Sequence, residues 1–512
     1  MFRSAWSGIA ASVIGVVLAG CASTPREQAA SRIDELTAAR QLPRPGWPGD
    51  ASSEAAAQKR TEELLAQLLT LERSLQLAFL RNPGIRTAYA ELGIAQSDVI
   101  EASRLPNPTF GYSRLRPDGG GHSQITRGLS LPLADLLLLP ARRRFARAEF
   151  ENAQLTIGNA LVDLASSVET AWFDYVSAKQ VAEMRRAVSR AADAAAEFAQ
   201  RSREAGNISA RNLALELAAA SEARIDAANA AADATRARLE LAAVLGISVR
   251  EKWDTANELP APPGGDAEEG VLLETALRQR MDAMALRRNV ALLEDALTLS
   301  RRWRFLGEVS VRYERESETD GARLSGPTLD LQLPIFNQGQ GAVLRARSQL
   351  ELAKAELATV ELSIRNDVAL ALDRLAASRD IAEQYRTALI PQREAVVART
   401  MEEYNFMLAG VFELLQAKRE EFDAYQQYLE AVRDYWITRV ELKRVAGGQL
   451  PGDEQSPKAT LGVDEIIKPM PAEDHSQHQG MGANPKGDPP ATQPESQKPS
   501  SPEHDAHSKP RE

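Results

Sequence analysis

The chain has 512 residues, of which 44% are hydrophobic and 26% are charged, with a formal net charge of −10 and 5% aromatic residues. This length and apolar content allow a folded core, whereas the acidic balance argues against nucleic acid as a partner. Alanine and leucine supply most of the apolar residues, which favours long helices.

Residues 1–20 have the pattern of a secretory signal peptide, with Arg3 ahead of the short apolar run Ile9–Leu18. The run ends in Leu18-Ala19-Gly20-Cys21, which resembles a bacterial lipobox, so we expect Cys21 to be lipidated. The alternative is a plain signal peptide beside a stray thiol. Cys21 is the only cysteine, so no disulfide is expected. No later apolar run reaches the roughly 18 to 20 residues of a spanning helix, so membrane crossing would need strands.

Residues 21–70 are expected to form a lipidated N-terminal lead-in, in which the proline-rich stretch Arg40–Asp50 is extended. A helix is predicted from Leu71, with a break near Asn82-Pro83-Gly84. It should continue to about Ser103, and its counterpart in the second half of the chain should start near Val271.

Two β-hairpins are predicted, one at about 108–133 and one at about 306–335. Apolar and polar residues alternate in both, which gives each strand one apolar and one polar face. Strands of this kind fit an outer-membrane barrel with a wet lumen; taken alone, each could be a surface hairpin. Four strands cannot close a barrel, since about eight is the smallest closed number. The chain must therefore share its barrel with other copies, because open sheet edges are not tolerated in lipid.

Each hairpin precedes two long helical stretches, and glycines break the later stretch of each pair, at Gly206 and Gly410. The expected stretches are Ala141–Ala187, Ala191–Gly246, Ala342–Ala388 and Pro391–Gly447. Coiled-coil seams recur in them at alternating steps of three and four residues. One seam is Val343, Ala346, Leu350, Ala353, Leu357, Val360 and Ile364, and another is Leu415, Phe422, Tyr425, Leu429, Val432, Trp436 and Val440. A detached coiled-coil rod is the alternative, but it leaves the hairpins unexplained.

The two halves of the chain repeat each other. Leu131-Pro132-Leu133 aligns with Leu333-Pro334-Ile335, in a strand expected to run from Thr328 into Ile335. Gly206 aligns with Gly410 at nearly the same offset. We therefore expect a first repeat over 71–265 and a second over 266–450.

Residues 451–512 are rich in proline, serine, glutamine and charged residues and are expected to be disordered. His475 and His478 repeat the spacing of His504 and His507. Imidazole binds Cu(II), Zn and Ni, so these four histidines are candidate ligands of weak metal sites. Solvated filler is the alternative.

The lipobox, the run L-E-R-S-L-Q-L-A-F-L-R-N-P-G-I from Leu71 to Ile85, the junction L-P-I-F-N-Q-G-Q-G after Gln332 and the two glycine-centred tips resemble the TolC family of outer-membrane efflux proteins. The resemblance implies a mainly α fold with a small β-barrel contribution. It implies a homotrimer in which each chain gives four strands to one barrel of twelve, continued by a periplasmic tube of helices. It also implies an exit duct, the partners being a periplasmic adaptor and an inner-membrane pump.

By the same resemblance, the tips at Gly206, Asn207 and Ser209 and at Gly410 and Val411 should dock the adaptor. We expect a left-handed or tightly turned backbone at Gly410. The best-known members place aspartates after the second tip glycine, where this chain has Gln416 and Arg419. These two residues are candidates for the entrance constriction, and an acidic filter is not expected there.

A wide duct needs no catalytic group, and the sequence offers none: His122, the histidine of the folded part, falls in a hairpin turn. We expect no enzyme activity and no cofactor. The expected location is the outer membrane, with a lipid anchor and contact with its lipid. Heavy-metal cations, copper or silver first, are the expected cargo. The alternatives are organic drugs or toxic solutes, and a structural coiled-coil lipoprotein that transports nothing.

Overall fold

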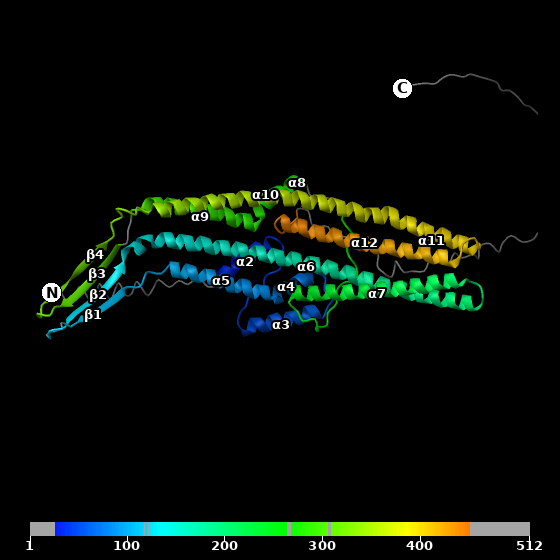
Figure 1. The fold of residues 1–512 in the computed structure, drawn as a ribbon, viewed down its shortest axis with the longest axis horizontal. Coiled ribbons are helices and arrows are strands. Elements are labelled where there is room, and N and C mark those ends of the chain that lie inside the picture. The colour runs from blue at the N-terminus through cyan, green and yellow to red at the C-terminus, as the bar shows by residue number, and fades with distance from the viewer. Residues whose placement is uncertain (1–25, 117, 121, 264–267, 306–308, 451–512) are drawn as a thin grey trace, which may run out of the picture. The chain divides into compact units, whose positions relative to one another are not determined.

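The computed structural model describes residues 26–450, apart from 117, 121, 264–267 and 306–308. The chain divides into two units, Met1–Ile467 and Lys468–Glu512, and the described residues all belong to the first. This unit is mainly helical, with four strands in one sheet (Figure 1). The predicted fold class, long helices plus two β-hairpins, is confirmed.

The described N-terminal part, from residue 26 to 102, contains four helices, and side chains cap the start of the last three. They are α2 (Arg26–Ala38), α3 (Ala51–Leu65), α4 (Leu71–Arg81) and α5 (Pro83–Ala102). The predicted break between α4 and α5 is present, because the Asn82 side chain accepts a hydrogen bond from the Gly84 amide at 2.7 Å and Pro83 opens the next helix. The stretch between α2 and α3 is not helical, as its prolines predict.

The four strands pair antiparallel in chain order, so that β2 and β3 join the two halves of the chain. They are β1 (Thr109–Leu115), β2 (Gln124–Pro132), β3 (Val309–Ser317) and β4 (Arg323–Leu331). The predicted extension of the last strand to Ile335 is wrong. β4 ends at Leu331, because Pro334 has no amide to donate to a sheet and the Ile335 amide turns back to the Leu333 carbonyl at 2.9 Å.

Eight helical elements remain in the described part of the chain, and the first is longer than the predicted stretch Ala141–Ala187. They are α6 (Leu133–Glu204), α7 (Ala210–Leu245), α8 (Glu269–Gln279), α9 (Met281–Trp303), α10 (Gln340–Gln384), η1 (Tyr385–Leu389), α11 (Ile390–Asn405) and α12 (Val411–Val445). The predicted boundary between Ala187 and Ala191 is wrong, since this stretch has neither glycine nor proline and Val188 packs in the core. The boundary predicted before Pro391 is also wrong. A single π-turn, η1, carries α10 into α11 and places Pro391 in the first turn of α11, where its missing N–H costs little.

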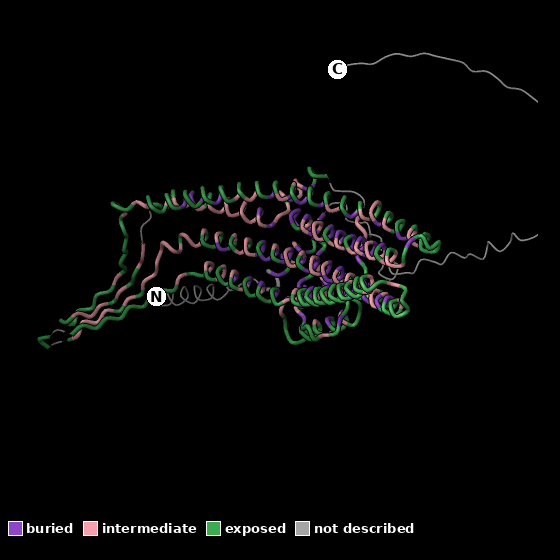
Figure 2. The backbone as a smooth tube through the Cα atoms, turned by 45° about the vertical axis from the view of Figure 1, so that its right-hand side comes forward, coloured by how far each residue is buried: buried purple, intermediate pink, exposed green. Residues whose placement is uncertain are grey.

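The helices pack as two antiparallel pairs, α6 with α7 and α10–α11 with α12, and α12 also packs on α6. The buried residues concentrate toward the middle of these helices (Figure 2). There Phe173 of α6 stacks on Trp436 of α12, with ring centroids 5.2 Å apart. The Trp436 indole donates to the Pro260 carbonyl at 2.6 Å, and the Trp172 indole donates to the Leu69 carbonyl at 3.0 Å. Both indole donors are therefore paired inside the core.

The predicted seams are the packed faces of their helices. In the first seam Ala346, Leu350, Ala353 and Ile364 are buried, and in the second all residues except Leu415 are buried. Among the described helices, none has an apolar segment long enough to cross a membrane.

Candidate functional site

The sheet has one apolar and one polar face, because neighbouring strands pair without a bulge and side chains alternate along each strand. The apolar face, in rows across the sheet, carries Phe110, Leu129, Tyr313 and Pro327, then Leu131, Val311 and Leu329, then Val309 and Leu331. Five of these side chains are more than half exposed in the single chain, namely Phe110, Leu129, Tyr313, Leu329 and Leu331, and so is the neighbouring Tyr112. An apolar face left this open is suited to a lipid environment.

The opposite, polar face is hydrophilic and concave. A hollow of about 340 Å³ lies on it, lined mainly by Thr109, Gly111, Ser113, Thr126, Gly128, Ser130, Arg312 and Glu314. Arg312 pairs with Glu314 at 3.0 Å and with Asp330 at 3.7 Å. Glu316 lies on the same face, so three carboxylates face one guanidinium there. This face is suited to water and to cations.

The helices end in two tight turns far from the sheet (Figures 1 and 2). We call residues 205–209 the first tip and residues 406–410 the second tip. In the first tip Gly206 has φ +79°, which is left-handed, and nothing surrounds the position of a Cβ there. Ser209 caps α7 by accepting from the Asn212 amide at 3.1 Å. Arg203 donates to the Ile208 carbonyl at 3.0 Å and holds the turn closed. Asn207 and Ser209 are exposed.

The second tip differs from the prediction. Gly410 has φ −84° and ψ 156°, an extended conformation open to any residue, and its amide donates to Glu413 at 3.3 Å. The expectation of a left-handed backbone at Gly410 is therefore wrong. The left-handed residue of this tip is Met407, with φ +59°. The turn is made three residues earlier than the glycine suggests, and Gly410 serves as the N-cap of α12.

The second tip also has an exposed apolar cluster that the sequence analysis missed. Phe406, Met407 and Leu408 are 77%, 93% and 79% exposed. The sequence could have indicated this cluster, because three successive large apolar residues here do not continue the helical period. An exposed apolar run of this kind usually marks a surface that binds a partner. Val411 is half-buried beside them.

The two constriction candidates are held by contacts within the chain. Gln416 is exposed and donates to Glu420 at 3.0 Å. Arg419 lies 3.8 Å from the nearly buried carboxylate of Glu216 on α7. Arg419 therefore links α12 to α7.

A second arginine, Arg185, joins three helices. Arg185 of α6 contacts Asp423 of α12 at 2.9 Å, Gln426 of α12, and Asp226 of α7 at 3.9 Å. It borders a groove of about 500 Å³ between these helices, whose charged lining combines six carboxylates with three arginines. Burial raises the pKa of Asp174 in this groove. No group of three or more histidine, cysteine, aspartate or glutamate side chains in the described part of the chain is placed to hold a metal ion.

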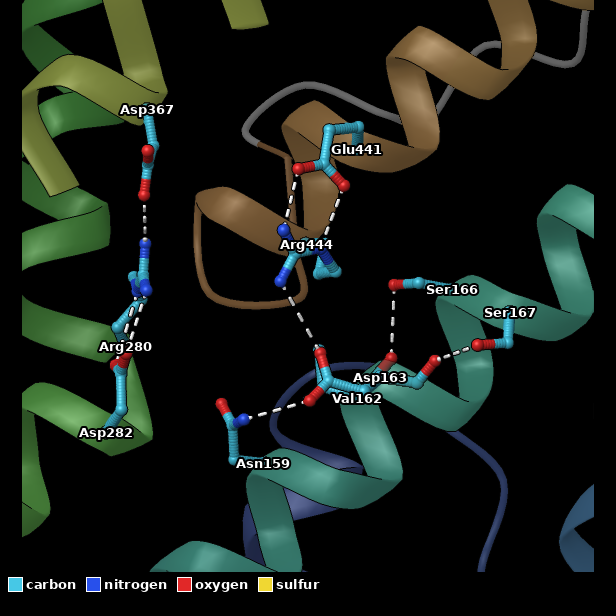
Figure 3. Close-up of polar contacts among 10 residues, drawn as sticks. All are labelled: Asn159, Val162, Asp163, Ser166, Ser167, Arg280, Asp282, Asp367, Glu441 and Arg444. Carbon is cyan, nitrogen blue, oxygen red and sulfur yellow. Dashed lines mark hydrogen bonds and ion pairs between the residues drawn. The ribbon is translucent and has the colours of Figure 1, made fainter. Parts of the chain in front are cut away.

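Two further arginines form ion pairs between helices (Figure 3). Arg444 of α12 contacts Asp163 of α6 at 3.7 Å and grips Glu441 on its own helix at 2.8 and 2.6 Å. Arg280, between α8 and α9, contacts Asp282 at 2.7 Å and Asp367 of α10 at 3.5 Å. These contacts fix α12 to α6, and α9 to α10.

Cys21 and the four histidines His475, His478, His504 and His507 lie outside the described residues. His122 is described and is an exposed residue of the first hairpin turn.

Residues 74–247 match the family described as "Outer membrane efflux protein". The chain is 24% identical over 385 residues to the cobalt-zinc-cadmium resistance protein CzcC of Cupriavidus metallidurans, a match covering 74% of this chain and 90% of the relative.

Two solved structures have a similar fold. A membrane protein from Pseudomonas aeruginosa aligns with a TM-score of 0.63 at 18% identity, covering 74% of this chain and 92% of the other. CusC, whose structures address folding and transmembrane channel formation, aligns with a TM-score of 0.61 at 15% identity over 76% of this chain and 92% of the other. At these identities the structural similarity concerns the fold.

Proposed function

Because this chain belongs to the TolC-like family of outer membrane efflux proteins, we propose that it is the outer-membrane exit channel of a tripartite efflux pump that exports heavy-metal cations. Members of this family are channels of the outer membrane and not enzymes. The observation that carries the proposal is the open four-stranded sheet with one apolar and one polar face.

The sheet predicts how many copies assemble. Its order leaves β1 and β4 each with a neighbour on one side only, which cannot persist in lipid. Two copies would close a barrel of about eight strands, whose interior is filled by side chains. Three copies close a barrel of twelve strands with room for a conduit, the apolar face toward lipid and the polar face toward the lumen.

A second apolar stripe on α10 supports the homotrimer. Leu344, Leu352, Leu362, Leu370 and Ile381 are about half exposed or more. At about 100° per residue they lie on one side of the helix, roughly opposite the buried seam residues such as Leu350 and Ile364. A helix with apolar residues on both sides packs on two neighbours. One neighbour lies within the chain, and the second would belong to an adjacent copy.

Pairing of β1 with β4 of the next copy can be tested by disulfide trapping. In a Cys21→Ser background, Thr328→Cys in β4 is combined with one substitution in β1: Thr109→Cys, Gly111→Cys or Ser113→Cys. Each combination places both thiols on the polar face. We expect covalent dimers and trimers from one of these pairs. The control combines Thr328→Cys with Gly128→Cys of β2. It should form no crosslink, because β3 lies between β2 and β4. A chain that stays monomeric in outer membranes and forms none of these crosslinks would contradict the barrel.

The two tips would dock the periplasmic adaptor. The exposed Phe406, Met407 and Leu408 provide apolar area for it, and Gly206, Asn207, Ser209, Gly410 and Val411 shape the turns that carry this area. Photo-crosslinkers at Ser209 or Val411 should capture the adaptor. Capture only from Gly120 or Asp320, in the hairpin turns, would reverse the orientation. Gln416 and Arg419 remain candidates for the entrance constriction, and an Arg419→Ala channel with raised ion conductance would support that role.

Cys21 would anchor the mature chain to outer-membrane lipid. One acyl chain alone holds a protein weakly, so the anchor would add to insertion of the barrel. Cys21→Ser should abolish metabolic labelling with palmitate while trimers still form. Unchanged labelling would contradict the lipobox.

Two observations favour metal cations as cargo. The polar face has three carboxylates and one arginine per chain, and the tail carries the histidine pairs His475/His478 and His504/His507. The resistance named for the relative CzcC is to cobalt, zinc and cadmium, whereas the tail histidines led us to place copper or silver first. Organic drugs or toxic solutes are the second candidate.

The cargo test compares a deletion strain with wild type on copper, silver, zinc, cobalt and cadmium salts and on organic toxins. Complementation with a chain truncated after Leu450 separates the channel from the tail. If the deletion strain is sensitive to metals and the truncated chain rescues it only in part, the result would support both metal export by the channel and a metal-binding role of the tail. Sensitivity to organic toxins alone would overturn the metal cargo and leave the channel intact. A wild-type response to every compound would favour a structural lipoprotein.

A further inference from the structure

The apolar face of the sheet changes character toward the hairpin turns. Next to the apolar rows, on the side of the hairpin turns, the row across the four strands contains Tyr112, Arg127, Arg315 and Ser325. The row beyond it reads Arg114, Ile125, Ser317 and Arg323. We call Arg114, Arg127, Arg315 and Arg323 the arginine belt; all four are exposed.

Charge is segregated between the two faces of the sheet. The side that bears the arginine belt has four arginines and no carboxylate in its strands, whereas Glu314, Glu316 and Asp330 all lie on the polar face with Arg312. Within the described residues, the Arg312 side chain has carboxylate partners, but no ion pair or hydrogen bond joins the side chain of any belt arginine to the protein. The belt is thus built without internal counterions.

Two members of the belt repel each other. Arg127 of β2 and Arg315 of β3 are paired residues in the ladder, so their side chains leave the same side of the sheet next to each other. Like charges directly opposite on neighbouring strands destabilise a sheet. An anion that bridges the two guanidinium groups would turn this repulsion into a clamp, since arginine binds phosphate in a bidentate manner.

The position of the belt identifies the anion. Tyr313 lies in the apolar row next to the belt and Tyr112 in the first row of the belt, and tyrosines in such a band mark the membrane–water boundary of outer-membrane barrels. The belt therefore begins at headgroup level, on the side of the barrel that faces lipid. We propose, on the basis of the channel proposed above, that the arginine belt binds the phosphate groups of anionic glycolipids in the outer leaflet. Three copies would form a closed ring of twelve arginines around the barrel.

The test measures lipid retention by the full-length trimer in detergent, using native mass spectrometry with bisphosphorylated lipid A. We expect the wild-type trimer to retain lipid A. The double variant Arg127→Gln/Arg315→Gln should retain at least about tenfold less, because each basic residue near an anionic surface adds to the attraction. Arg312→Gln on the polar face is the matched control and should retain lipid A as wild type does. Arg127→Lys/Arg315→Lys keeps the charge without the planar fork and should fall between wild type and the glutamine variant.

Assembly is read in the same samples from heat-modifiable trimers. Trimers that retain dephosphorylated lipid A as well as the phosphorylated form, or an Arg127→Gln/Arg315→Gln trimer that retains lipid A like wild type, would overturn the lipid site and leave the channel intact. Release of the lipid by millimolar inorganic phosphate would show a free-phosphate site and also overturn it. If wild type forms no trimer, the channel proposal fails, and the arginine belt fails with it.

Discussion

Arg444 of α12 lies 3.7 Å from Asp163 of α6, and through this contact the last helix of the chain is joined to the long helix that follows the first hairpin. The same guanidinium is hydrogen-bonded to Glu441 at 2.8 and 2.6 Å. The two carboxylates respond to it in opposite ways. Burial raises the pKa of Asp163 despite Arg444, whereas the hydrogen bonds from Arg444 lower the pKa of Glu441.

We predict opposite effects of neutralising these two carboxylates. A raised pKa means that ionised Asp163 disfavours the folded state at neutral pH, so Asp163→Asn should leave the thermal midpoint unchanged or raise it. A lowered pKa means that ionised Glu441 favours the folded state, so Glu441→Gln should lower the midpoint. Both side chains are almost half exposed, so solvent screening limits each effect to about 0.5 kcal/mol.

The pKa shifts of Asp163 and Glu441 also determine how the stability of each variant depends on pH. The contribution of Glu441 is complete above the pKa that it has when unfolded and is lost as pH falls through its lower folded value. Glu441→Gln should therefore differ from wild type at neutral pH and converge with it in acid. Asp163→Asn should converge with wild type as Asp163 takes up its proton. Circular dichroism melts of the trimer across this range are the measurement, and equal losses of stability for both variants at neutral pH would contradict the assignment.

The two tip glycines should tolerate substitution very differently. Gly206 is left-handed, a conformation that costs a β-branched residue roughly 1–2 kcal/mol, whereas Gly410 is extended with open space around it. Gly206→Val should loosen the first tip, seen as faster amide exchange between Asn207 and Asn212, while Gly206→Asn and Gly410→Val should have little effect. A Gly410→Val tip that exchanges as fast as Gly206→Val would show that Gly410 has a role beyond its backbone.

Substitutions on adjacent residues of β4 should separate the two faces of the sheet. Leu329 is exposed on the apolar face, and its neighbour Thr328 lies on the polar face. An arginine facing lipid costs about 2–4 kcal/mol near the middle of the bilayer. We therefore expect Leu329→Arg to deplete trimers from outer membranes and Thr328→Arg to preserve them. The reverse result on heat-modifiable gels would exchange the lipid and lumen faces.

The stacked pair at the middle of the helices should dominate stability. Phe173 is 2% exposed and stacks on Trp436, while Phe198 on the same helix is 50% exposed. Phe173→Ala should cost about 3–5 kcal/mol through lost burial and the cavity left behind. Phe198→Ala is the control and should change the thermal midpoint little.

The sequence alone determined the local features of this protein. The alternation of Val309, Val311 and Tyr313 predicted a two-faced strand, and the spacing of Leu350, Ala353 and Ile364 predicted the buried seam. Both patterns work because side-chain period follows directly from backbone geometry. Asn82-Pro83 likewise predicted a helix break that the structure contains, since capping and the missing proline N–H act within a few residues.

The tertiary structure decided what depends on contacts between distant residues. Continuation of α6 past Val188 depends on core packing, and the left-handed turn fell on Met407 although Gly410 was available. Position after the second tip made Arg419 a candidate for the entrance, but only the structure shows its contact with Glu216 of α7. The arginine belt needed the register of four strands from both halves of the chain, because only pairing between β2 and β3 places Arg127 beside Arg315.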